Sequence, residues 1–189
     1  MAIKQSLKLK LAVFFTALGW MSQLHAQNWT LTEASIISFD IKTVGLSAVK
    51  GVSNQPDSRL FFDINLPENS SVQLILPAST LKFSNDALRP MILGENFFDA
   101  AQFKNVTFKS TEFRQHAVGH YWVAGELTLR GIIKPITFDV VLKPNAANAK
   151  LLDINASGSI NRSDFGMKRS YADVGDKVNI QLIGQWQPK

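Results

Sequence analysis

The sequence has 189 residues, of which 20 are Lys or Arg and 15 are Asp or Glu, and it contains no Cys. The lack of thiols excludes disulfides, thiolate catalysis and Cys-ligated zinc. The mildly basic balance comes without any run of Lys and Arg interleaved with aromatic residues, which argues against nucleic acid as a partner.

The first 26 residues have the pattern of a secretory signal peptide. Three Lys residues precede an apolar run from residue 11 to 20, and a Leu24-His25-Ala26 triplet follows. We expect cleavage after Ala26, which leaves residues 27–189 as one domain that is periplasmic or secreted and has no stable membrane span. Because Leu24 is larger than the residue usual at that position, a retained N-terminal anchor is the alternative, although the apolar run is too short to span a bilayer.

The rest of the chain is dominated by apolar residues that alternate with polar ones. This period of two is typical of β-strands with one buried face. Together the runs predict about eight or nine strands, at residues 37–41, 60–66, 72–76, 106–113, 123–129, 136–142, 152–160 and 178–186.

Residues 84–103 interrupt this alternation and predict a short helical or lid segment. Ser84 or Asn85 is a suitable N-cap, and Pro90 is expected to interrupt the helix. An all-β chain hides its sheet edges by closing into a barrel or by stacking two sheets. A barrel of about eight strands has an interior that side chains fill or that one small ligand occupies, and alternation alone favours the filled interior.

No catalytic residue can be assigned from the sequence. His116 and His120 have a spacing that suits a metal on a helix, but their surroundings predict two strands and a turn. No carboxylate or thiol lies close to them in sequence, so we predict no metal site. The sequence also lacks the Gly-x-Ser-x-Gly elbow of many hydrolases and the Gly-Lys-Ser ending of a phosphate loop.

Four segments, in this order, resemble those of the YceI-like family of polyisoprenoid-binding periplasmic proteins. They are VGLSAVKG at residues 44–51, NFFDAAQFKNVTFKS at 96–110, GELTLRGIIKPITFDV at 125–140, and INRSDFGM at 160–167 followed by VGDKVNI at 174–180. The chain departs from the family at Glu33-Ala34-Ser35, where a His is frequent in the first strand.

The resemblance implies an extended lipocalin-like antiparallel β-barrel with an apolar tunnel, without catalysis or a catalytic cofactor. The expected ligand is a polyisoprenoid or isoprenoid quinone, an amphiphile whose isoprenoid tail the protein sequesters or transports. The alternatives are a structural or stress-related interaction module with a filled barrel, and a hydrolase with Ser or His at the barrel mouth. A homodimer is left open.

The residues expected to bind this ligand are those predicted to face the tunnel, although a single bulge can invert the parity of a run. Arg162 is placed at the rim as a contact for the lipid head, because its planar donor fork suits that use. The alternative for Arg162 is a turn in which it bonds to backbone. The predicted tunnel residues are Phe39, Phe62, Ile64, Leu74, Phe97, Phe98, Phe108, Leu127, Leu129, Phe138, Ile154, Phe165 and Met167.

Overall fold

The computed structural model describes residues 28–43, 49–54, 56–167 and 174–189. The expected signal peptide with its cleavage site lies outside these ranges. Residues 44–48, which begin the first of the four family-like segments, also lie outside them.

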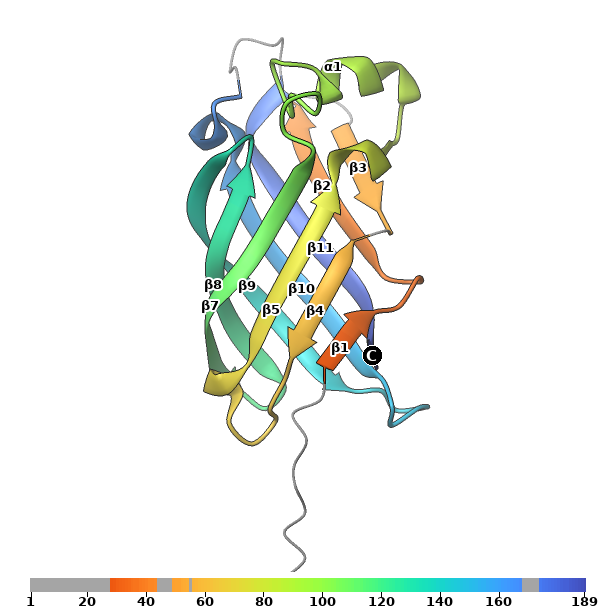
Figure 1. Ribbon diagram of the computed structural model, residues 1–189, viewed down its shortest axis with the longest axis vertical. Helices are drawn as coiled ribbons and strands as arrows, with labels where there is room; N and C mark the ends of the chain where they lie inside the picture. Colours follow the sequence, from red (N-terminus) through yellow and green to blue (C-terminus); the bar gives the residue numbers. More distant parts are fainter. Residues whose placement is uncertain (1–27, 44–48, 55, 168–173) are drawn as a thin grey trace, which may run out of the picture.

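The described chain is built almost entirely of antiparallel strands (Figure 1). Their alternating burial follows the sequence pattern; in β8, for example, buried and exposed or half-buried residues take turns along the strand. The strands are β1 (Asn28–Leu31), β2 (Ile36–Thr43), β3 (Val49–Ser53), β4 (Asp57–Phe61), β5 (Ser71–Pro77), β6 (Lys82–Phe83), β7 (Asn105–Ala117), β8 (His120–Leu129), β9 (Ile132–Pro144), β10 (Leu152–Asn161) and β11 (Val174–Pro188).

The sheet closes into a barrel. Eight strands follow one another in the order β1, β4, β5, β7, β8, β9, β10 and β11, and pairing of β1 with β11 completes the ring. The other strands, β2, β3 and β6, continue from β11 in that order. Closure leaves the ring strands without free edges, which confirms the prediction of an all-β barrel of about eight strands.

At several places in the barrel wall, two short strands take the place of one long strand. Strands β1 and β2 pair with successive parts of β11, because Leu31 lies opposite Trp186 and Ile36 lies opposite Ile183. Between them Ser35 bonds to the backbone of Gln185, with Ser35 Oγ 3.0 Å from its N–H. In the same way β3 pairs with β2 and β6, whereas β4 pairs with β1 and β5. The wall of the barrel therefore continues past the ends of these short strands.

A helical segment lies at one end of the barrel, where the sequence predicts it (Figure 1). It consists of the 3₁₀ helix η3 (Asp86–Leu88) followed directly by α1 (Arg89–Leu93). Asn85 caps η3, because its Oδ1 accepts the N–H of Ala87 at 3.0 Å. The prediction that Pro90 interrupts the helix is wrong: Pro90 lies in the first turn of α1, where its missing N–H needs no partner.

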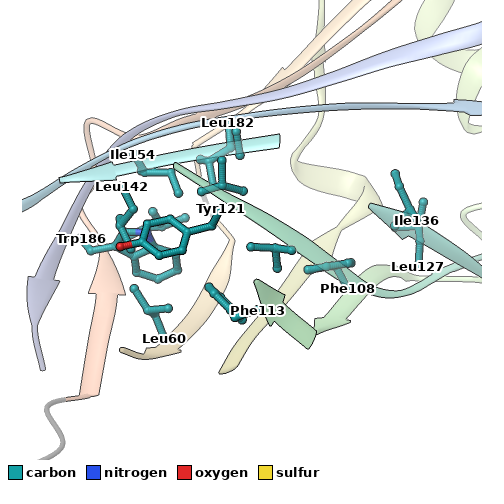
Figure 2. Close-up of a cluster of buried hydrophobic side chains, with 14 of the residues drawn as sticks. Leu60, Phe108, Phe113, Tyr121, Leu127, Ile136, Leu142, Ile154, Leu182 and Trp186 are labelled. Atoms are coloured by element: carbon teal, nitrogen blue, oxygen red, sulfur yellow. The ribbon is translucent and has the colours of Figure 1, made fainter. Parts of the chain in front are cut away.

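The buried side chains form two clusters inside the barrel. The larger one runs from the end remote from α1, where Figure 2 shows Tyr121 and Trp186, to Phe97 and Met167 near α1. The smaller cluster lies beside α1 and comprises Ile41, Val49, Leu81, Phe83, Ile92 and Val178. The described helices lack the length and apolar character that crossing a membrane requires.

Candidate functional site

The interior of the barrel contains an apolar cavity on the side of α1, called here the main cavity. Its volume is about 130 Å³. Strands from all around the barrel contribute to its wall, and Met91 and Ile92 of α1 with Phe97 and Phe98 beyond the helix line it at that end. Among the described residues that line it, Arg162 is the one charged side chain.

A second cavity of about 70 Å³ lies deeper in the barrel, away from α1. It is lined by apolar side chains of β4, β5, β7, β8, β9, β10, β11 and β2. Both cavities share the same boundary residues, which are Ile37, Leu74, Phe108, Phe138 and Ile180. The lumen is therefore two chambers separated by a narrow layer of side chains.

Two aromatic rings dominate this boundary. The rings of Phe108 and Phe138 meet edge to face, with centroids 5.1 Å apart and planes at 84°. Each ring lies against a glycine of a neighbouring strand: a Cβ on Gly125 would come within 2.6 Å of the Phe108 ring, and one on Gly158 within 2.8 Å of the Phe138 ring. The two glycines let the rings lie close to the barrel wall, which leaves space in the centre.

Large aromatic side chains fill the end of the barrel remote from α1. Tyr121 and Trp186 are almost fully buried there among aliphatic residues, as Figure 2 shows. Phe62 packs edge to face on Tyr121, with ring centroids 5.7 Å apart. Burial raises the pKa of the Tyr121 hydroxyl above its ordinary value. Trp186 also lines the second cavity, so these aromatic residues form the far end of the lumen.

Arg162 lies inside the barrel end and not at a solvated rim, which corrects the prediction. It begins the 3₁₀ helix η4 (Arg162–Phe165) and is 1% exposed. Its Nε donates to the carbonyl of Gly175 at 2.9 Å, and its guanidinium lies 5.4 Å from the centre of the Phe97 ring. The alternative for Arg162, a turn in which it bonds to backbone, is therefore confirmed.

The turn around Arg162 is fixed by further bonds. The Asp176 carboxylate accepts the N–H of Ser163 at 2.9 Å and its hydroxyl at 2.7 Å. Arg130, in the turn between β8 and β9, donates to the carbonyls of Phe97 at 3.0 Å and Gly166 at 3.1 Å. The segment after α1 and the η4 turn are thus tied to each other over the main cavity.

Most of the predicted tunnel residues do face the lumen. The main cavity is lined by Phe39, Leu74, Phe97, Phe98, Phe108, Leu127, Leu129, Phe138 and Met167, and the second cavity by Ile154. Phe165 instead packs within the core, and the half-buried Phe62 packs against it. Whether these residues bind a ligand stays a prediction.

The prediction for Ile64 is wrong, because this side chain is 58% exposed. Strand β4 ends at Phe61, and Asp63 Oδ1 then accepts the N–H groups of Asn65 at 2.9 Å and Leu66 at 3.2 Å. This Asx-type turn ends the alternation before Ile64.

Sequence reasoning also missed part of the lining. Four further residues line the main cavity. Ile37 and Ile41 have the same parity as the predicted Phe39 in β2, and Val178 and Ile180 belong to the alternating run at residues 178–186, so the alternation contains the signal for them. Met91 and Ile92 lie in the helical segment, where no periodic pattern indicates which face turns inward.

Comparison with known proteins gives a consistent result. The family model described as the YceI-like domain matches residues 29–185. A UPF0312 protein of Yersinia pestis (strain Pestoides F) is 27% identical over 151 residues, which cover 78% of each chain.

Solved structures share the fold. BcnA of Burkholderia cenocepacia superimposes with a TM-score of 0.74 at 20% identity, over 82% of this chain and 98% of that one. A polyisoprenoid binding domain from Saccharophagus degradans, implicated in plant cell wall breakdown, gives a TM-score of 0.69 at 12% identity, over 87% and 100%.

Proposed function

The chain belongs to the YceI-like family, and on this basis we propose that it is a carrier that holds the apolar tail of a polyisoprenoid or isoprenoid quinone inside its barrel. The observation that carries the proposal is the lumen itself, because a barrel with a filled interior would have no chamber for a guest. Two apolar cavities remain between the described side chains, and a shared layer of side chains separates them.

The lining of the main cavity suits an alkyl or isoprenoid chain. Aliphatic and phenyl side chains offer dispersion contacts and no hydrogen-bonding groups along most of the wall. Transfer of a CH₂ group from water to such a surface is worth about 0.8 kcal/mol, so two or three five-carbon units provide on the order of 10 kcal/mol before the costs of association and ordering. Affinity then depends mainly on tail length. The structural similarity to a domain described as polyisoprenoid binding supports this ligand class.

The size of the main cavity limits how a tail fits. Its 130 Å³ is comparable to the apolar cavity of about 150 Å³ that accommodates benzene in another protein, which is roughly the space of one five-carbon unit. A longer tail must displace side chains of the lining. Met91 and Met167 at the α1 end have flexible side chains that can move aside. We infer that binding of a long tail widens the boundary between the two cavities.

We further propose that the carrier acts after export, in the periplasm or outside the cell. The basis is the N-terminal pattern of three Lys residues, an apolar run and the Leu24-His25-Ala26 triplet. Cell fractionation together with mass determination of the mature N-terminus checks this. A chain that begins at residue 27 in the exported fraction supports it, and an uncleaved cytoplasmic chain contradicts it.

The binding proposal is tested by two matched tryptophan substitutions on β11. Ile180 lines both cavities, whereas Ile183 is exposed on the outside of the same strand. Natively purified protein is extracted with organic solvent for mass spectrometry, and binding of added prenols is measured by displacement of an environment-sensitive lipid probe. We expect an isoprenoid lipid in wild type and in Ile183→Trp, and little in Ile180→Trp.

Circular dichroism checks that both variants fold, because overpacking a core costs about 1–3 kcal/mol. Wild-type protein that yields no lipid and ignores added prenols contradicts the proposal. Equal lipid binding by the two folded variants contradicts the assignment of the site to the lumen.

A further inference from the structure

Three metal-ligating side chains meet on the outer face of the barrel, away from the lumen. His116 is on β7, His120 begins β8 and Asp139 is on β9, so they come from three neighbouring strands. All three residues are accessible to solvent, with the His116 side chain 28% exposed and that of Asp139 63% exposed. The turn between β7 and β8 returns the chain at Gly119, whose φ of +72° suits glycine, and brings the two His residues near each other.

The sequence gives no indication of the third residue. Asp139 is 19 positions beyond His120, and only the pairing of β8 with β9 places it opposite Trp122, two residues along β8 from His120. The four-residue spacing of the two His residues, which suits a helix, is met here by a hairpin. The sequence analysis predicts no metal site because no carboxylate lies close to the two His residues along the chain. The tertiary structure brings such a carboxylate, that of Asp139, next to them.

The distances are close to those of a coordination sphere. One ligand atom from each side chain lies within 4.8 Å of the others, and Nε2 of His116 is 3.8 Å from Oδ1 of Asp139. Bonds of about 2.0–2.1 Å in a tetrahedral zinc site place the ligand atoms about 3.4 Å apart. Small rotations of exposed side chains close this difference.

One of the ligands is already oriented. The imidazole of His116 stacks on the indole of Trp122, with centroids 4.5 Å apart and planes at 19°, and the guanidinium of Arg114 lies 4.9 Å from the Trp122 ring. The stack restricts the rotation of His116 before any ion arrives, which lowers the ordering cost of binding. The strands themselves are part of the closed barrel, so the Cα positions are fixed.

We propose that His116, His120 and Asp139 bind a divalent transition-metal ion, with Zn²⁺ as the first candidate. Two imidazoles and one carboxylate are ligands that Zn²⁺ accepts, whereas Mg²⁺ and Ca²⁺ require oxygen ligands throughout. Three protein ligands leave one tetrahedral position for water or for a group from another molecule. The site is separate from the lumen and does not depend on the proposed lipid binding.

The test is Zn²⁺ binding to purified, tag-free protein that has been treated with EDTA and dialysed. Isothermal titration calorimetry is expected to give one Zn²⁺ per chain, and His116→Ala, His120→Ala and Asp139→Asn are each expected to weaken binding tenfold or more. Glu126→Gln, which changes another exposed carboxylate of β8, is the matched control and is expected to bind as wild type does.

Fluorescence gives a readout of location. Cu²⁺ at this site quenches the adjacent Trp122, which is 41% exposed, and leaves the emission of the buried Trp29 and Trp186 largely intact. Trp122→Phe removes the quenching but retains Zn²⁺ binding. Absence of Zn²⁺ binding in wild type overturns the proposal and leaves an ordinary His–Asp contact. Binding that survives all three ligand substitutions overturns the assignment to these residues.

Discussion

Replacement of Phe138 by Ala is expected to join the two cavities and to lengthen the tail that the lumen accepts. The ring of Phe138 forms half of the edge-to-face pair at the boundary, 5.1 Å from Phe108. Removing it frees roughly the space of a benzene ring, which is close to one five-carbon unit. At about 0.8 kcal/mol per carbon, one more buried unit is worth about 4 kcal/mol gross, of which we expect at least about 1.4 kcal/mol, a tenfold gain in affinity, to remain.

The assay compares prenols of increasing length by probe displacement. In wild type, affinity is expected to rise with length and then to level off, and in Phe138→Ala the plateau moves by about one isoprene unit. The same substitution lowers the free energy of unfolding by about 3 kcal/mol, because a large half-buried ring is lost. Phe62→Ala is the matched control, since Phe62 is also half-buried but lines neither cavity.

Identical length profiles in wild type and Phe138→Ala refute the reasoning. An equal shift in Phe62→Ala refutes it as well, because it shows that general loosening of the core, and not the boundary, determines tail length.

Three further predictions concern stability and titration. Gly125→Ala is expected to lower the free energy of unfolding by about 1–3 kcal/mol in urea titrations, because its Cβ would lie 2.5 Å from the carbonyl oxygen of Lys109. A Cβ on Gly158 would meet only side-chain atoms, of Phe138 and Ile136, so an equal loss in Gly158→Ala contradicts the argument. Hydrogen bonds from Asn145, and to a smaller extent from Gln185, lower the pKa of Asp153 in the folded protein. The stability that the Asp153 carboxylate contributes is therefore present above its unfolded pKa near 4 and is lost as the pH falls through the folded pKa. The melting temperatures of Asp153→Asn and wild type should become equal in acid. Because burial raises the pKa of Tyr121, the absorbance change of its ionisation should occur above the ordinary value near 10. The protein should lose stability as the pH rises through that range. Tyr121→Phe should abolish this high-pH absorbance change.

The alternation of apolar residues was sufficient to predict the fold class and much of the lining. Phe39, Leu127 and Ile154 lie on strands whose parity the sequence shows directly, and each faces a cavity. The pattern fails where a strand ends without a strong breaker. Ile64 continues the alternation of β4 in sequence, but the Asp63 side chain turns the backbone before it is reached.

The environment of a charged residue was beyond local reasoning. Arg162 follows directly on a strand, which suggests a solvated end, yet η4 folds it inward beneath Phe97 and against the carbonyl of Gly175. That burial depends on contacts with residues 65 positions before it and 13 after it, and no local pattern encodes them.

The sequence by itself determined that the chain forms a closed or stacked antiparallel sheet, because period-two alternation fixes which side chains share a face whatever their partners are. Tertiary structure alone decided three things: that β1 closes on β11, that Phe108 and Phe138 meet over two glycines and divide the lumen, and that Asp139 joins two His residues on the outer face. The physical reason is that each depends on strand order and register. These are set by pairing between residues far apart in the chain.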